Sequence, residues 1–193
     1  MNIDYFPYLN AEALMSLKAM QSYVNDTVTL RCMLNFAKRL FDDKIIPKPQ
    51  YDRICQSIVN KSFNDNGYDL LDNPQKPNET GIVAEVKCYV PAGSNGSYGR
   101  NQKKQIDTDI ANLDPSSTKA RLHAKSVNLA KYVKFLVLLN HRGLYINAIQ
   151  NVMNMTTRTH QKKYPQLVGY DPQQVLTAKA NPQNDIFVIE VDI

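Results

Sequence analysis

The sequence has no tryptophan, only three cysteines, and no apolar run long enough to cross a membrane. A membrane helix needs roughly 20 apolar residues. The best candidate here, Tyr132–Leu139, is short and is interrupted by Lys134. The first residues, Met1–Phe6, contain Asp4 and lack the basic and apolar regions of a secretory signal peptide. We therefore expect a cytoplasmic protein that makes no contact with a membrane.

The cysteines and histidines are too dispersed to form a structural zinc site. Cys32, Cys55 and Cys88 include no Cys-x-x-Cys pair, and the three histidines are scattered through the second half of the chain. A chain of 193 residues can bury a substantial core without disulfides or metals. We therefore expect three free thiols in a reducing compartment.

Two common catalytic motifs are also absent. The sequence contains no Walker-type Gly-Lys-Ser/Thr loop, so we expect no nucleotide cofactor. No serine or cysteine lies in a recognisable nucleophile elbow, which argues against a covalent serine or cysteine mechanism. The features that do indicate chemistry are a moderate positive charge and one pair of charged residues inside an apolar segment.

The positive charge is concentrated after residue 100. The chain has 23 basic and 18 acidic residues, a net charge of +5 and a pI near 9.0. Residues 100–134 contain eight bases and three acids, and Arg158–Lys163 is followed by no acid until Asp171. This distribution favours an anionic partner such as nucleic acid, although a solvated helix face has a similar composition.

The hydrophobic pattern predicts helices first and then alternating strands and helices. The early helices are expected from Asn10 to about Tyr23, from a cap at Asp26 or Thr27 to a point before Pro47, and over Tyr51–Val59. Strands are expected over 68–72, 81–90, 132–139 and 186–191, and helices over 102–113, 118–131 and 144–155. This order predicts an α/β fold, a mixed central sheet flanked by helices, with a helical N-terminal region. We expect one domain over 1–193, with a helical part over 1–63, a core over 67–140 and a C-terminal helix and strand over 141–193.

Glu85 and Lys87 lie inside the apolar segment Gly81–Val90. Side chains two residues apart on a strand point to the same face, so both share a face with Val83. Burying a carboxylate and an ammonium there costs several kcal/mol unless the two groups are paired or hold a ligand. The pattern therefore favours a functional site, and the alternative is an ordinary ion pair on a partly exposed strand.

The preceding short strand supplies another carboxylate. If Asp69 lies opposite Glu85 in an antiparallel pair, Leu71 lies opposite Val83 and both prolines of the connection stay in the loop. The alternative register, with Asp72 opposite Glu85, places a proline in a strand. Asp69 is therefore the first choice for the second carboxylate and Asp72 the reserve.

Two carboxylates that converge near a lysine form a hard-oxygen site. Mg²⁺ suits such a site because it binds through few protein carboxylates and keeps water or phosphate oxygens as its other ligands. The backbone carbonyl of Val86 is a candidate for an additional ligand. We expect Mg²⁺ as the cofactor, with Mn²⁺ as a substitute.

The pattern Tyr68-Asp69-Leu70-Leu71, followed by a loop and Ile82–Lys87, resembles the PD-(D/E)xK nuclease superfamily, which includes many type II restriction endonucleases. The resemblance covers about Gly67–Asn140, with tyrosine where the motif name has proline. It implies a restriction-endonuclease-like fold in which Asp69 and Glu85 bind metal and Lys87 lies near the attacking water. It also implies a supporting glutamine or lysine on the next helix, where the candidates are Gln102, Lys103 and Gln105.

The resemblance implies a Mg²⁺-dependent DNA endonuclease that hydrolyses phosphodiester bonds. The first expectation is a type II restriction enzyme that cuts double-stranded DNA as a homodimer, with the N-terminal helices as a candidate interface. The alternatives are a repair or Holliday-junction-resolving nuclease of the same superfamily, or a DNA-binding module without catalysis. Residues expected to contact DNA are the polar and basic ones after the lysine strand and near the C-terminal third: Asn95, Ser97, Tyr98, Arg100, Gln102, Lys103, Lys104, Arg158, Lys162 and Lys163.

Overall fold

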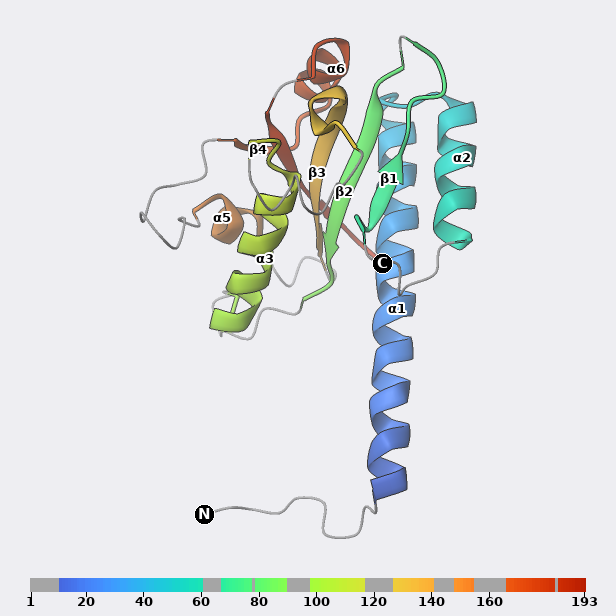
Figure 1. Ribbon diagram of the computed structural model, residues 1–193, viewed down its shortest axis with the longest axis vertical. Coiled ribbons are helices and arrows are strands. Elements are labelled where there is room, and N and C mark those ends of the chain that lie inside the picture. Colours follow the sequence, from blue (N-terminus) through green and yellow to red (C-terminus); the bar gives the residue numbers. More distant parts are fainter. Residues whose placement is uncertain are drawn as a thin grey trace.

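A five-stranded mixed sheet forms the centre of the fold, and helices cover both of its faces (Figure 1). The computed structural model describes residues 11–60, 67–77, 79–89, 98–116, 127–140, 148–154, 166–182 and 184–193. The strands are β1 (Leu70–Asp72), β2 (Gly81–Lys87), β3 (Tyr132–Leu139), β4 (Leu167–Gly169) and β5 (Ile186–Val191), in the sheet order β1-β2-β3-β5-β4. β1 runs antiparallel to β2, and the other neighbouring strands are parallel. The predicted α/β class with a mixed sheet is confirmed.

The N-terminal region is one continuous helix, α1 (Ala11–Asp42), and the predicted division into two helices is wrong. The hydroxyl of Thr27 donates a hydrogen bond to the carbonyl oxygen of Tyr23, four residues earlier, at 2.9 Å. Such a bond is made within a helix, so Thr27 continues α1 and does not cap a second helix. The predicted first cap, Asn10, lies outside the described residues.

The predicted third helix is confirmed as α2 (Lys48–Val59), which begins earlier than expected. Pro49 lies in its first turn, where a missing backbone N–H removes no intrahelical hydrogen bond. A turn through Lys44, with a φ of 59°, joins α1 to α2. Pro47, before which the preceding helix was expected to end, is the N-cap residue of α2.

The later elements match the predictions in part. β3 and β5 have the predicted bounds, whereas β1 and β2 are shorter than expected. The next helices are α3 (Arg100–Leu113), the single 3-10 turn η1 (Leu129–Lys131) and α5 (Ala148–Met153), and most of the predicted helix 118–131 lies outside the described residues. The sequence missed β4 and α6 (Pro172–Ala180), for which a polar connection was expected.

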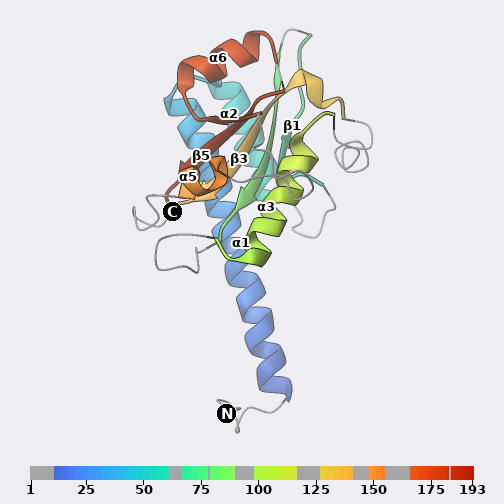
Figure 2. The same ribbon diagram turned by 90° about the vertical axis from the view of Figure 1, so that its left-hand side faces the viewer.

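The two faces of the sheet support two apolar cores. One core lies between the sheet and α1, α2 and α6, and includes Phe36 and Phe135, whose ring centroids are 5.0 Å apart. The other lies between the sheet and α3 and α5, and includes Ile110 and Leu136. The turned view in Figure 2 shows α3 and α5 in front of the sheet and α1 and α2 behind it.

β2 contributes alternate residues to these cores. Ile82, Ala84 and Val86 belong to the core under α1, while Val83 belongs to the core under α3. Glu85 and Lys87 continue the series of Val83 and therefore lie on the α3 face, as predicted.

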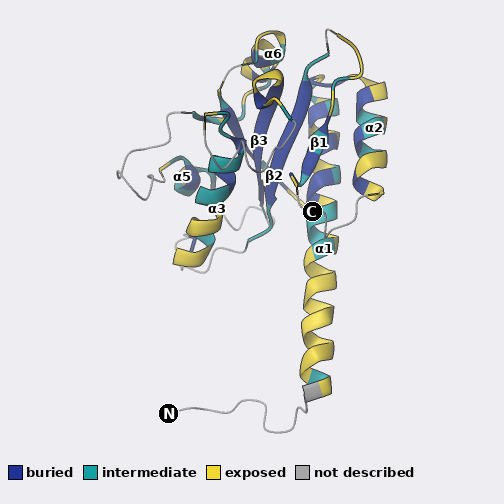
Figure 3. Cartoon of the chain, viewed as in Figure 1, coloured by how far each residue is buried: buried dark blue, intermediate teal, exposed yellow. Residues whose placement is uncertain are grey.

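The N-terminal half of α1 extends beyond the body of the fold (Figure 3). Its apolar side chains are exposed, and the sequence interval 14–24 contains six of them: Leu14, Met15, Leu17, Met20, Tyr23 and Val24. Among the described helices, including this one, none has the length and apolar character needed to cross a membrane.

Lys134 is fully buried on the α3 face of β3, and its ammonium group donates to the carbonyl of Tyr132 at 3.2 Å. Burial lowers the pKa of Lys134 to about 8, although Asp185 and Asp114 act in the opposite direction. The unfolded chain binds this proton up to a pH near 10.4, so the contribution of Lys134 to the free energy of unfolding should rise between pH 8 and pH 10.

We predict that Lys134→Met raises the free energy of unfolding by about 1–3 kcal/mol at pH 7, because it removes a buried charge and keeps the apolar volume. The gain over the wild-type protein should shrink toward pH 10, where Lys134 is neutral in the folded state. Urea unfolding at several pH values measures both effects, with Lys104→Met on the exposed side of α3 as the control. A variant that is less stable than the wild-type protein at pH 7 would contradict the prediction.

Candidate active site

The hairpin of β1 and β2 has the register predicted with Asp69 as the partner of Glu85. Leu71 lies opposite Val83, and Leu70 lies opposite Ala84. The same register, continued by one residue, places Asp69 opposite Glu85 just before β1 begins. A carboxylate oxygen of Asp69 accepts a hydrogen bond from the backbone N–H of Val86 at 2.7 Å, which fixes the side chain at the edge of β2.

A pocket of about 270 Å³ lies at this end of β2. Asp69, Val86 and Lys87 contribute to its wall, together with Asn25 and Thr29 of α1. Its remaining lining residues are Cys88 and Tyr89. Three of the predicted site residues, which are up to 18 positions apart in the sequence, therefore meet in one cavity.

Lys87 supplies the positive charge of the pocket wall. Its ammonium group lies 3.0 Å from a carboxylate oxygen of Asp109 on α3, and 5.8 Å from the centre of the Tyr89 ring. Burial alone would lower the pKa of Lys87, but the negative charges of Asp109, Asp69 and Glu85 raise it above its ordinary value. Lys87 is therefore a fixed cation at neutral pH, surrounded by three carboxylates.

Glu85 is buried beside the pocket and does not line it; its exposed fraction is 5%. Burial and the nearby charge of Glu85 raise the pKa of Tyr68. The Tyr68 hydroxyl donates to the backbone carbonyl of Asn112 at 3.0 Å, which joins the start of the hairpin to α3. Tyr68 thus ties the start of the hairpin to the C-terminal turn of α3.

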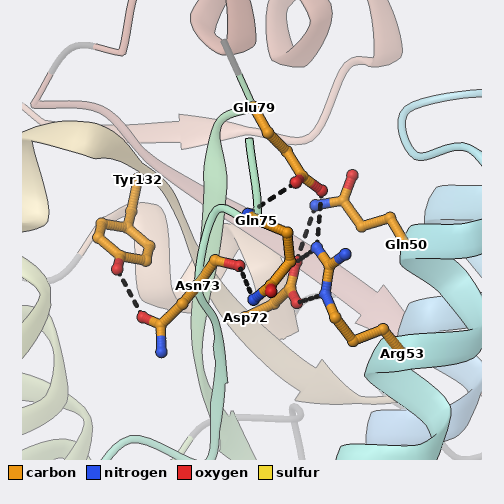
Figure 4. A network of polar contacts seen from close by, with 7 residues as sticks. All are labelled: Gln50, Arg53, Asp72, Asn73, Gln75, Glu79 and Tyr132. Atoms are coloured by element: carbon orange, nitrogen blue, oxygen red, sulfur yellow. Dashed lines mark hydrogen bonds and ion pairs between the residues drawn. The ribbon is translucent and has the colours of Figure 1, made fainter. Parts of the chain in front are cut away.

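Asp72, the reserve choice for the metal site, does not lie beside Glu85. It lies opposite Ile82 and points toward α2, on the other face of the sheet. Arg53 binds both of its carboxylate oxygens, at 2.7 and 3.0 Å, and Gln50 donates to one of them at 2.8 Å (Figure 4). Asp72 is thus a partner of α2 and holds the hairpin against that helix.

The same network extends to the loop between β1 and β2. Arg53 also bonds Glu79 at 2.6 Å, and Glu79 accepts from the backbone N–H of Gln75 at 2.8 Å. Burial alone would raise the pKa of Glu79, but its bonds to Arg53 and Gln75 lower it. The loop end of the hairpin is therefore anchored to α2, far along β2 from the pocket.

The helix residues expected to support the site are not among those that line the pocket. Gln102 accepts a hydrogen bond from the backbone N–H of Gly99 at 2.8 Å and so caps α3, while Lys103 and Gln105 are exposed. α3 contributes Asp109 instead, a residue that the sequence analysis missed. The signal was present, because Asp109 lies at the spacing of the apolar face formed by Ile106 and its neighbours.

The expected DNA contacts have different outcomes. Tyr98 is buried, with an exposed fraction of 3%, and its hydroxyl has no hydrogen-bond partner within the described parts of the chain. Its predicted role as a DNA contact is therefore wrong, because it packs in the core under α3. Arg100, Lys103 and Lys104 are exposed on α3. The other candidates lie outside the described residues: Asn95, Ser97, Arg158, Lys162 and Lys163.

The donor set at the pocket is compatible with a Mg²⁺ ion. In the described ranges of the chain, no three side chains of His, Cys, Asp or Glu form a metal-binding group. Mg²⁺ needs fewer protein side chains than three, since it usually binds through one or two carboxylates and keeps several waters as its other ligands. Asp69, the carbonyl of Val86 and the neighbouring Glu85 meet that requirement in residue type.

No family model, no curated protein and no solved structure matches the chain.

We predict that Asp109→Asn lowers the free energy of unfolding by about 1–3 kcal/mol, because it leaves Lys87 without its nearest ion-pair partner in a largely buried place. The matched control is Asp52→Asn, which removes the partner of Lys48 in an exposed pair on α2. That variant should lose less than about 0.5 kcal/mol. Urea unfolding measures both, and equal losses would contradict a structural role for the Lys87–Asp109 pair.

Proposed function

We propose that this protein is a Mg²⁺-dependent DNA endonuclease, in the first instance of the type II restriction kind. The observation that carries the proposal is the pocket at the end of β2, which is lined by Asp69 from before β1 and by Lys87 of β2, the strand that also buries Glu85. In a strand that is apolar elsewhere, two charged residues are costly to bury, and Lys87 draws on the carboxylates of two further residues, Asp109 and Asp69, for compensation.

Asp69, Glu85 and the Val86 carbonyl are the groups that would hold the cation. A bound Mg²⁺ supplies a Lewis acid that polarises a phosphate and lowers the pKa of water. Because its pKa is raised, Lys87 does not act as a general base at neutral pH. Its ammonium group instead donates hydrogen bonds, orients the attacking water and stabilises the negative charge that develops on the phosphate.

The pocket size suits a phosphodiester group better than a whole nucleotide. A volume of about 270 Å³ lies just below the range of pockets that enclose drug-sized ligands. The DNA backbone would therefore lie across the opening and present one phosphate to Lys87. Arg100, Lys103 and Lys104 on α3 offer positive charge for neighbouring phosphates, and such contacts weaken as salt concentration rises.

One observation favours the alternative of a DNA-binding module without catalysis. Lys87 is held by Asp109 at 3.0 Å, so a substrate must compete with that ion pair for its ammonium group. A repair or junction-resolving nuclease has the same site requirements as a restriction enzyme. The products of cleavage separate these alternatives: discrete double-strand fragments indicate restriction, and nicks or cuts at branches indicate repair.

We predict that Glu85→Gln and Lys87→Ala each reduce the rate of DNA cleavage at least 100-fold, since they remove a cation ligand and a charge that acts on the transition state. DNA affinity measured in Ca²⁺ should change less than about five-fold, because most of it comes from phosphate contacts. Circular dichroism confirms that each variant is folded, and Lys48→Ala on α2 is the control. Full cleavage by either variant would rule out this site.

A double-strand cut at a palindromic sequence needs two active sites, and we propose that α1 supplies the contact between two copies of the chain. Leu14, Leu17, Met20 and Val24 fall within about a third of the circumference of the helix, and all are half exposed or more exposed, at 48–62%. The opposite side of this part of α1 carries Ser22 and Asp26. An apolar stripe on a projecting helix gains most from pairing with another apolar surface.

We predict that the protein is a dimer by size-exclusion chromatography with light scattering, and that the double variant Leu17→Lys/Met20→Lys is a monomer. Two lysines in the stripe would have to lose their hydration in the contact. Ser22→Lys, on the other side of α1, should leave the dimer intact. A wild-type monomer, or a dimer that both variants preserve, would show that α1 is not the interface.

A further inference from the structure

Two of the three cysteines lie in contact beside the pocket. The Sγ atoms of Cys32 on α1 and Cys88 at the end of β2 are 3.4 Å apart. They are 56 positions apart in the sequence, so the fold and not the local chain brings them together. The third cysteine, Cys55, lies on α2 and interacts with Tyr51.

The two thiols differ in their access to small molecules. Cys32 has no exposed surface, whereas Cys88 is partly exposed and lines the pocket next to Lys87. A disulfide has an S–S distance near 2.05 Å, so the two sulfurs must approach each other by roughly 1.4 Å. An accessible thiol with a buried thiol directly behind it is the arrangement of a reactive cysteine and its resolving partner.

We propose that Cys32 and Cys88 form a reversible disulfide when the protein meets hydrogen peroxide, and that this disulfide regulates the pocket. Disulfides of proteins in reducing compartments are mostly transient and redox-sensing. The bond would join α1 to the end of β2 beside Lys87. The regulatory part of the proposal rests on the proposed nuclease function, while the formation of the disulfide does not.

The reaction balances with one peroxide for each pair of thiols. The Cys88 sulfur attacks one peroxide oxygen, the O–O bond breaks, and the other oxygen leaves as hydroxide, which takes the thiol proton and becomes water. The Cys32 sulfur then attacks the sulfenic acid on Cys88, the S–S bond forms, and the hydroxyl leaves with the Cys32 proton as a second water. Two thiols are oxidised by two electrons in total, and one peroxide is reduced to two waters.

The formation of the disulfide is tested by mass spectrometry of the full chain. The protein is treated with hydrogen peroxide, the peroxide is removed, and the remaining thiols are labelled with N-ethylmaleimide in urea. We expect a loss of two hydrogens, a label on Cys55 alone, a cross-linked peptide containing Cys32 and Cys88, and labels on all three cysteines after dithiothreitol.

The variants decide whether the link is specific. Cys55→Ser should form the same cross-link, and Cys32→Ser should form none. A Cys32 that stays labelled in the treated wild-type protein would overturn the proposal. So would a Cys88 that pairs with Cys55 or with another molecule.

A cleavage assay tests the regulatory part. The oxidised wild-type protein should cut DNA at least ten-fold more slowly than the reduced protein, and dithiothreitol should restore the rate. Without peroxide, Cys32→Ser should cleave at the reduced wild-type rate, and after peroxide treatment Cys55→Ser, which still forms the link, should be slowed as the wild-type protein is. Unchanged cleavage by the cross-linked protein would overturn the regulation. If the reduced protein does not cleave at all, the proposed function fails, and the mass spectra still decide on the disulfide.

Discussion

The need to satisfy two charged groups inside β2 is the constraint on which this end of the molecule depends. Glu85 and Lys87 lie on the face that α3 covers, where an apolar side chain would be less costly. The positive charge of Lys87 is compensated by its ion pair with Asp109 of α3, and the negative charge of Asp69 acts on it as well. Lys87, Asp109 and Asp69 therefore form one group of charges where α3, β2 and the start of the hairpin come together.

The hairpin that holds these charges is anchored at both ends by different means. At the loop end, Arg53 of α2 binds Asp72 and Glu79, so the network fixes the loop to the helix layer behind the sheet (Figure 4). At the pocket end, Asp69 precedes the first residue of β1, and its carboxylate accepts a hydrogen bond from the backbone N–H of Val86. The backbone ladder between β1 and β2 therefore begins at Leu70, one residue inside the pair Asp69 and Glu85.

The sequence pattern predicts most of the sheet and the core of the site. The register of Leu71 opposite Val83 follows from the positions of two prolines, and β3 is evident from its apolar run, which only Lys134 interrupts. Asp109 was missed because a carboxylate at the edge of a helical apolar face looks like ordinary amphipathic character until its partner is known. The continuity of α1 was missed because Asp26 and Thr27 are good caps by residue type, and only the backbone shows that Thr27 bonds within the helix.

The central claim is that Asp69, Glu85 and Lys87 form a metal-dependent nuclease site. The most direct measurement incubates the reduced wild-type protein with supercoiled plasmid DNA in Mg²⁺, and in parallel with EDTA. The account predicts conversion of the plasmid to nicked or linear products in Mg²⁺ and none in EDTA. An intact plasmid in Mg²⁺ and in Mn²⁺, with DNA bound, would contradict the claim and identify a binding module.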